Sequence, residues 1–153
     1  AIVTGRTPVS ADESEVRSAN EAFYRAFEAL DLRGMEAAWS HGGAVSCVHP
    51  GWPLANGWSE VRETWRVIFE NTADIRFDIE HLLVDVQGDL AWVVCTEQLR
   101  SRSAAGSDEG TVLATNVFRR EDGVWKVAHH HGSPFVAPLR PRLPGGTRKG
   151  MVH

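Results

Sequence analysis

The sequence predicts one α+β domain in which helices come first and a curled antiparallel sheet follows. Two observations indicate this order. Apolar residues recur at three- and four-residue spacing from Val16 to Ile68, and from Ile75 to Ser133 they alternate with a period of two. Chains in which helices precede a run of strands pack the helices on one face of the sheet. The length of 153 residues fits a single domain with one core.

Two helices are predicted before residue 40. Ser10-Ala-Asp-Glu13 has the form of a capping box, in which the Ser10 hydroxyl bonds the amide of Glu13. An apolar stripe follows, on a helix of about five turns: Val16, Ala19, Phe23, Phe27 and Leu30. A second, short helix over residues 31–39 is expected to be capped by Asp31.

A short strand and a third helix are predicted next. Residues 44–49 read as a strand that ends at Pro50, which has no backbone N–H to donate to a sheet. Val45, Cys47 and His49 would share one face of this strand. Residues 51–57 read as a loop, and a helix follows over residues 59–70, with Val61, Trp65 and Ile68 facing the core.

Four antiparallel strands are predicted between Ile75 and Ser133. The apolar phase of the first strand reverses near Glu80 and His81, which is the pattern of a β-bulge. In the second strand we expect one face to hold Trp92, Val94, Thr96 and Gln98. Asp122-Gly123 predicts a tight hairpin turn into the last strand.

The last strand, residues 123–133, contains three consecutive histidines. Simple alternation puts Trp125, Val127, His129 and His131 on one face, and Val124, Lys126, Ala128 and His130 on the other. Lys126 marks the second face as the wetter one. We therefore expect His129 and His131 to look into one pocket. A histidine on an apolar face is also often a hydrogen-bonded core residue without chemistry, and that alternative stays open.

The composition argues against several classes of function. The formal net charge is −4, and no basic cluster precedes the last fifteen residues, so nucleic acid is not an expected partner. No apolar run approaches the ~18 residues of a membrane helix, and we expect a cytoplasmic location. Two cysteines, Cys47 and Cys95, do not make a disulfide framework. We expect a flexible segment over residues 1–11, the domain over 12–135 and a tail rich in Pro, Gly and Arg over 136–153.

Several short strings, in this order of elements, resemble the nuclear transport factor 2-like superfamily, in its SnoaL-like and ketosteroid-isomerase-like branch. The resemblance covers roughly residues 12–135. The strings that carry it are Ala29-Leu30-Asp31-Leu32, Val48-His49-Pro50, Gly57-Trp58, Thr115-Asn116-Val117-Phe118-Arg119, Asp122-Gly123, Trp125-Lys126-Val127 and His131-Gly132-Ser133. It implies a cone-shaped, cystatin-like α+β barrel, a sheet wrapped around the N-terminal helices with a pocket at the wide end. This superfamily contains both enzymes and pure binding domains.

The resemblance also implies roles for single residues. His49 stands where ketosteroid isomerases have a base aspartate before a proline, and Asn116 where they have a protonated acid. Phe23 stands in place of the donor tyrosine and has no hydroxyl, while Tyr24 is about 100° further round the helix. The resemblance further implies a homodimer through the outer sheet face, where we expect the apolar residues Leu113, Val117, Val93 and Cys95.

The leading hypothesis is a cofactor-free acid–base enzyme, an isomerase, dehydratase or cyclase for a small, largely apolar carbonyl or hydroxyl compound. His49 would be the base, Asn116 the donor to developing oxyanion charge, and His131 a second acid. The residues expected to contact the substrate are Phe23, Tyr24, Phe27, Trp52, Trp92, Thr96, Gln98, Phe118 and His129.

Three alternatives stay open. The domain is a non-catalytic dimer that binds a ligand or serves association, or the inward polar residues form a buried network without chemistry. The third alternative is a metal site made by His49, His129 and His131, the three-histidine set of catalytic zinc or copper sites.

Overall fold

The computed structural model describes residues 10–136, and within this range the chain forms three helices and six strands. The predicted tail and most of the predicted N-terminal segment lie outside these residues. None of the described helices is long and apolar enough to cross a membrane. In chain order the elements are α1 (Ala11–Glu28), α2 (Leu32–Ala38), β1 (Ser46–Val48), β2 (Ala55–Asn56), α3 (Trp58–Asn71), β3 (Asp74–Gln87), β4 (Leu90–Ser103), β5 (Gly106–Glu121) and β6 (Val124–Pro134).

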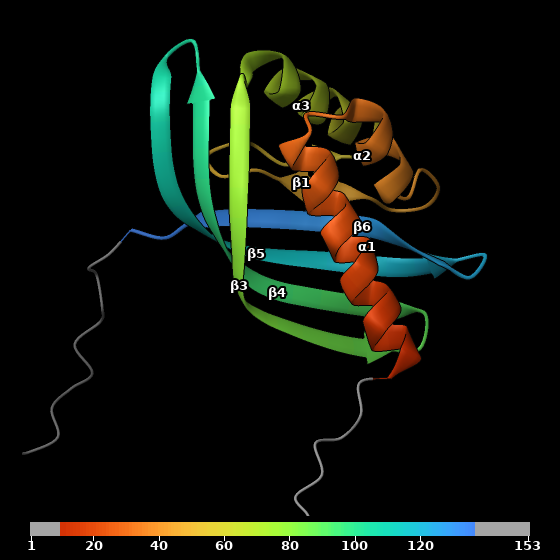
Figure 1. Ribbon diagram of the computed structural model, residues 1–153. Coiled ribbons are helices and arrows are strands. Elements are labelled where there is room, and N and C mark those ends of the chain that lie inside the picture. Colours follow the sequence, from red (N-terminus) through yellow and green to blue (C-terminus); the bar gives the residue numbers. More distant parts are fainter. Residues whose placement is uncertain (1–9, 137–153) are drawn as a thin grey trace, which may run out of the picture.

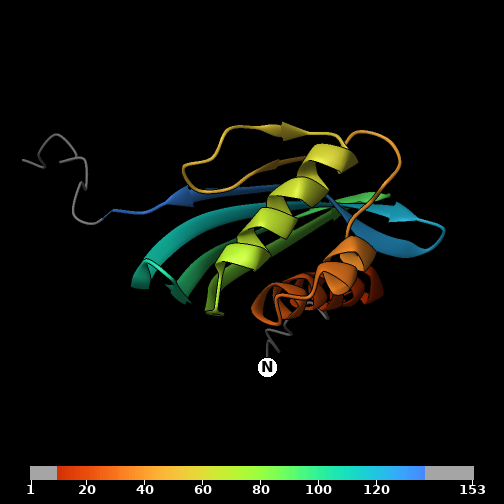
Figure 2. The same cartoon turned by 90° about the horizontal axis from the view of Figure 1, so that it is seen from above.

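The strands form one sheet in the order β2-β1-β6-β5-β4-β3. The pairs from β3 to β6 are antiparallel, as the sequence predicts, whereas β1 runs parallel to β6. Figure 1 shows that the long strands bend strongly and that α1 crosses the concave side of the sheet. The view from above places all three helices on that side (Figure 2), and the sheet stays open, with β2 and β3 at its edges. The α+β class and the curled sheet are therefore confirmed.

The helix boundaries follow local capping chemistry. The Ser10 hydroxyl accepts a hydrogen bond from the amide of Glu13 at 3.1 Å, and Asp31 caps α2 by accepting from the amide of Gly34 at 3.0 Å. Both caps were predicted. The third helix extends one residue beyond its predicted range at each end. It starts at Trp58 because the turn before it is made at Gly57, whose φ of 86° a residue without a side chain adopts readily.

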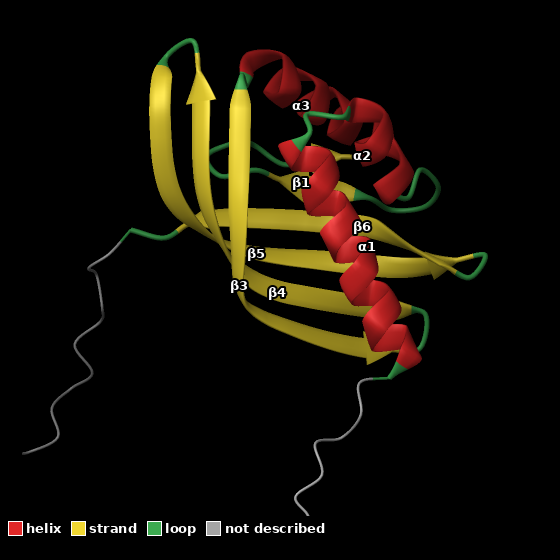
Figure 3. Ribbon diagram, in the orientation of Figure 1, coloured by secondary structure: helices red, strands yellow, loops and turns green. Residues whose placement is uncertain are grey.

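The predicted bulge in β3 is present. Pairing with β4 shifts register between Glu80 and Leu83, and His81 adopts a φ of 52° at this point. As a result, apolar side chains pack on the core on both sides of the shift: Ile75, Phe77, Ile79, Leu82, Val84 and Val86. The bend in the strand is visible to the left of α1 in Figure 3.

A second bulge, in β6, was not predicted and reverses the histidine faces. Val117 pairs with His129 but its neighbour Phe118 pairs with Val127, so Ala128 is the extra residue. Beyond it, His130 faces the core with 2% of its surface exposed, and His131 is exposed on the outer face. The expectation that His129 and His131 face inward is therefore wrong, because one extra residue moves every following side chain to the other face.

The predicted face of β4 is also wrong. Val93 and Cys95 are buried in the core, whereas Trp92 lies on the outer face with 40% of its surface exposed. Both faces of this strand are apolar, so alternation alone does not say which one is covered. The smaller side chains turn inward because aromatic residues of α1 fill the interior, and the Tyr24 hydroxyl lies 3.5 Å from the Cys95 sulfur.

The core centres on an aromatic cluster between α1 and α3. The rings of Phe23 and Phe27 meet the Trp65 ring edge to face, with ring centres 5.6 and 4.8 Å apart. Phe23, Trp65 and Phe118 are fully buried. This cluster fixes the helices over the sheet and closes the interior above β1 and β6.

Candidate functional site

Four polar side chains, on three neighbouring strands and at the end of a fourth, face the inside of the sheet. These are His49, just after β1, His130 on β6, Asn116 on β5 and Glu97 on β4. All four are buried, and so is a fifth member of the set, Asn20 of α1. We call this set, together with Tyr24 of α1, the inner polar stripe. The stripe crosses the sheet obliquely, because Asn116 pairs with His130 but its partner on β4 is Val93, four residues before Glu97.

Hydrogen bonds connect most of the stripe in a fixed direction. His130 Nδ1 lies 2.5 Å from Asn116 Oδ1, and because that oxygen only accepts, the imidazole donates. The Asn116 amide in turn donates to Asn20 Oδ1 at 2.8 Å and to Tyr24 Oη at 3.3 Å. The Tyr24 hydroxyl donates to Glu97 Oε2 at 2.5 Å. Each residue thus donates to the next, from His130 through Asn116 and Tyr24 to the Glu97 carboxyl.

His49 stands at the other end of the stripe, with its ring centre 6.0 Å from that of His130. Its Nε2 lies 2.9 Å from Thr64 Oγ1, and the Thr64 hydroxyl donates its own hydrogen to the carbonyl of Val61 at 2.7 Å. His49 Nε2 therefore donates, and Nδ1 carries the lone pair. The Trp65 ring meets the imidazole edge to face at 4.6 Å.

Burial moves the pKa values at the two ends of the stripe in opposite directions. It lowers the pKa of His49 to about 4, because the charged imidazolium loses its hydration. Burial also lowers the pKa of His130 well below its usual value, with repulsion from the neighbouring histidines adding to the effect. The pKa of Glu97 rises to about 7 through burial, although the hydrogen bond from Tyr24 opposes the rise. Near neutral pH the imidazoles are thus uncharged, and the Glu97 carboxyl is present in both its protonated and its ionised form.

A hollow of about 320 Å³ reaches the stripe between α1 and β3. Asn20 and Tyr24 line it from the helix, and its walls include the apolar side chains of Phe77, Ile79 and Leu82. This volume is at the lower end of the range for small-molecule sites. The charged residues Glu21, Arg25 and Glu28 of α1 also line the hollow. A small compound in it would contact the side chain of Tyr24.

The structure places the predicted catalytic residues unequally. His49 and Asn116 face the interior as predicted. The prediction that His131 joins them in one cavity is wrong, because the bulge at Ala128 turns His131 to the outer face and His130 takes the inner position.

The residues expected to contact a substrate also divide between the two faces. Phe23, Phe27 and Phe118 are buried in the core, and the Phe23 ring lies 5.2 Å from that of His130. Trp52 is 38% exposed beside His49, with ring centres 5.5 Å apart. The residues on the outer face are Trp92, Thr96, Gln98 and His129.

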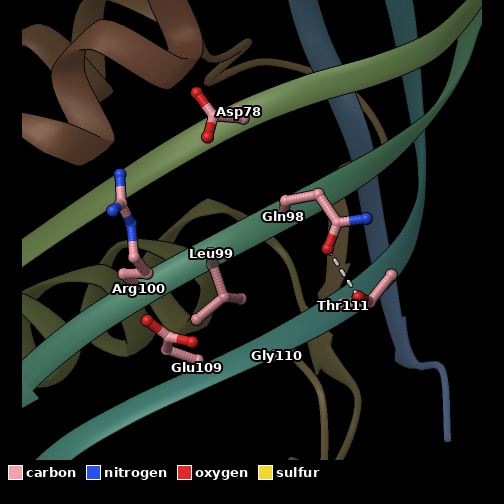
Figure 4. Close-up of a pocket in the computed structure, with 7 residues that line it drawn as sticks. All are labelled: Asp78, Gln98, Leu99, Arg100, Glu109, Gly110 and Thr111. Carbon is pink, nitrogen blue, oxygen red and sulfur yellow. Dashed lines mark hydrogen bonds between the residues drawn. The ribbon is translucent and has the colours of Figure 1, made fainter.

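Gln98 lines a different hollow, of about 500 Å³, on the outer face of the bent strands. Figure 4 shows its position beside Thr111, whose hydroxyl donates to Gln98 Oε1 at 2.6 Å, with charged side chains of both signs around them. This hollow does not communicate with the stripe, because the sheet itself lies between them.

The predicted three-histidine metal set does not converge. His49 lies on the inner face, whereas His129 and His131 lie on the outer face. Residues 10–136 contain no group of three or more His, Cys, Asp or Glu side chains that could hold a metal ion.

Three residues of the stripe were missed from the sequence: Asn20, Glu97 and His130. Asn20 follows Val16 by four residues, so its place on the apolar face of α1 was visible in the spacing. Glu97 continues the alternation of Ala91, Val93 and Cys95, which marks it as inward once that face is assigned to the core. No feature of the spacing marked His130 as the histidine that faces inward.

Comparison with known proteins agrees with this geometry. A family model described as a SnoaL-like domain matches residues 16–138. The chain belongs to the SnoaL-like domain family. A solved structure of a candidate dehydratase of the NTF2-like family from Streptomyces avermitilis is 40% identical to this SnoaL-like domain, with a TM-score of 0.77, and the match covers 82% of this chain and 97% of that one.

Other relatives carry different names on the same fold. A candidate calcium/calmodulin-dependent protein kinase type II association domain from Thiobacillus denitrificans is 33% identical, with a TM-score of 0.69, over 78% of this SnoaL-like domain's chain and 94% of its own. The F-box protein SKIP8 of Arabidopsis thaliana is 29% identical over 138 residues, which are 86% of this chain and 57% of that protein. The chain thus spans little more than half of that relative.

Proposed function

We propose that this SnoaL-like domain is a cofactor-free acid–base enzyme, an isomerase, dehydratase or cyclase that acts on a small, largely apolar carbonyl or hydroxyl compound. The observation that supports it is the directed hydrogen-bond chain of the inner polar stripe, which ends on a buried carboxyl that titrates near pH 7. Acid–base catalysts work best when their pKa lies near the operating pH. The similarity to the candidate dehydratase from S. avermitilis supports the same class of chemistry.

In this proposal Glu97 is the proton store and Tyr24 the group that touches the substrate. In the structure the Tyr24 hydroxyl donates to Glu97 Oε2, and protonation of Glu97 reverses this hydrogen bond. The protonated Glu97 then passes its hydrogen to Tyr24 Oη while the Tyr24 hydrogen moves to a substrate atom in the hollow, which leaves Glu97 as the carboxylate. The reverse transfer removes a substrate proton. Asn116 donates to Tyr24 Oη and so holds the phenol in position for both directions.

His49 was predicted to be the base, and that role stays a prediction. Its environment works against it, because a pKa of about 4 leaves the imidazole a weak acceptor at pH 7. Its Nε2 is also engaged with Thr64. We therefore assign the proton-transfer role to Glu97 and regard His49 as an uncharged residue that lines the interior.

Hydrogen exchange in D₂O tests the proposal without knowledge of the natural substrate. A panel of cyclic and acyclic ketones is incubated with the protein, and loss of the α-proton signals is followed by NMR. We expect exchange that Glu97→Gln reduces by roughly 10² or more. Glu109→Gln, on the outer face, is the matched control and should match the parent. Equal exchange in the parent and in a folded Glu97→Gln variant would remove Glu97 from the mechanism.

A second candidate function, a dimeric association domain, is favoured by a separate observation. Leu83, Trp92, Val94 and Leu113 are all exposed on the outer face, where a monomer would leave them in water. The similarity to the candidate association domain from T. denitrificans supports it. Val93 and Cys95, which the sequence placed here, are in the core.

Light scattering tests this second candidate. We expect a dimer at micromolar concentration and a monomer for Leu113→Asp, since a charge in the centre of an apolar contact is not solvated. Asp85→Asn, also on the outer face, is the control. A monomeric parent protein would refute the association proposal and leave the enzyme proposal standing.

A further inference from the structure

His129 and His131 lie side by side on the outer face of β6, two positions apart. Their ring centres are 6.1 Å apart and their planes are nearly perpendicular, at 85°. His131 is exposed and His129 is half-buried. Neither belongs to the inner polar stripe, so the acid–base proposal leaves them without a role.

The partner of His129 orients its ring for coordination. Ser46 pairs with His129 across the β1–β6 ladder, and Ser46 Oγ lies 2.7 Å from His129 Nδ1. With the hydrogen on Nδ1, the serine oxygen accepts it and the Nε2 lone pair is free. Metal-binding histidines commonly use their second nitrogen in this way, which fixes both the tautomer and the ring orientation.

The spacing of the two rings suits one metal ion. Zinc binds imidazole nitrogen at about 2.0–2.1 Å, which places the centres of two bound rings about 5–6 Å apart. The observed separation of 6.1 Å needs only a small side-chain rotation to reach this range. Residues two apart on a strand hold such a pair on one face without distortion of the backbone.

The surroundings select the kind of metal. The side chains paired with the two histidines on the neighbouring strands are uncharged: Ser46, Val48, Thr115 and Val117. A site of imidazoles without carboxylates favours zinc or copper over calcium or magnesium. A hollow of about 230 Å³, lined by Val94, Leu113, Thr115, His131 and Ser133, leaves room on the same face.

We propose that His129 and His131 bind zinc, and that the same pair from a second copy of this chain completes four nitrogen ligands. Structural zinc sites are closed and four-coordinate, and one chain supplies two ligands here. A twofold dimer brings identical faces together, and the exposed Val94 and Leu113 lie beside His131 on this face. The proposal rests on the outer-face dimer proposed above and adds a metal that stabilises it.

Zinc titration of the untagged protein, with light scattering in zinc chloride and in EDTA, tests this proposal. We expect one zinc for every two chains, and a dimer dissociation constant at least about tenfold lower with zinc than with EDTA. The His129→Ala/His131→Ala variant should lose the zinc and the difference. His81→Ala, an exposed histidine on β3, is the matched control and should keep both.

The other outcomes separate the two proposals. A dimer that is equally stable in zinc and in EDTA overturns the metal site and leaves the dimer. A monomer under both conditions overturns both. Binding of one zinc per chain, or zinc retained at the same affinity by the double variant, overturns the bridging site.

Discussion

The two faces of the sheet differ in how they treat their polar and apolar side chains. Inward, Glu97, Asn116 and His130 are polar, buried and hydrogen-bonded. Outward, β4 and β5 expose large apolar side chains such as Trp92 and Leu113. Each face thus carries exceptions to the usual expectation of apolar side chains inside and polar side chains outside. A buried polar group is tolerated because it has a partner, and an exposed apolar face indicates that something covers it.

The largest expected effect is on the free energy of unfolding, when the substitutions of two tryptophans are compared. Trp65 is fully buried between α1 and α3, so Trp65→Ala should lower the free energy of unfolding by about 3–5 kcal/mol. Trp92 is 40% exposed, and Trp92→Ala should lower the stability of the monomer by less than about 1 kcal/mol. Urea denaturation at low protein concentration measures both. Similar losses for the two variants would contradict the assignment of faces on β4.

The next effect concerns pH. The pKa of Glu97 is raised from 4.5 to about 7, so the folded protein holds this proton more tightly than the unfolded chain. The stabilisation from Glu97 is complete below about pH 4.5, is lost as the pH rises towards 7, and changes little above that. His49, whose pKa is lowered, has the opposite dependence, with stability lost as the pH falls from 6.5 towards 4.

Comparison of the parent with Glu97→Gln isolates the carboxyl from the histidines. Between about pH 5 and pH 8 the stability of the parent relative to this variant should fall, by about 3 kcal/mol at most. Chemical denaturation at the two pH values measures it. Glu109→Gln, exposed on the outer face, should show no such trend. A constant difference would mean that Glu97 has an ordinary pKa in the folded protein.

A smaller effect contrasts Asn116 with its neighbour on the outer face. Asn116→Ala removes the acceptor of His130 and one donor to Tyr24, and should cost about 1–3 kcal/mol because buried polar groups lose their partners. Thr115→Ala should cost about 0.5 kcal/mol or less. Thermal unfolding by circular dichroism distinguishes them. If Asn116→Ala were as stable as the parent, the stripe would not be a connected network.

A strand's face could be predicted only where a change of polarity marks which side chains turn inward. The bulge near Glu80 was predicted because apolar residues mark the phase on both sides of it. The bulge at Ala128 was not, because three identical residues follow it and no change of polarity reveals which of them turned inward. The face of β4 was assigned wrongly for a related reason, since Trp92 and Val93 are both apolar.

The sequence by itself determined the helices, their caps, the antiparallel strands and the family, because these depend on local spacing, capping residues and short motifs. Tertiary structure decided which face of β4 and which histidines of β6 meet the core. It also decided that Tyr24 meets Glu97 and that His49 lies beside His130. Such choices depend on the space that α1 and α3 leave above the sheet and on one extra residue in a ladder. Both are properties of the packed chain, which an alternating pattern does not contain.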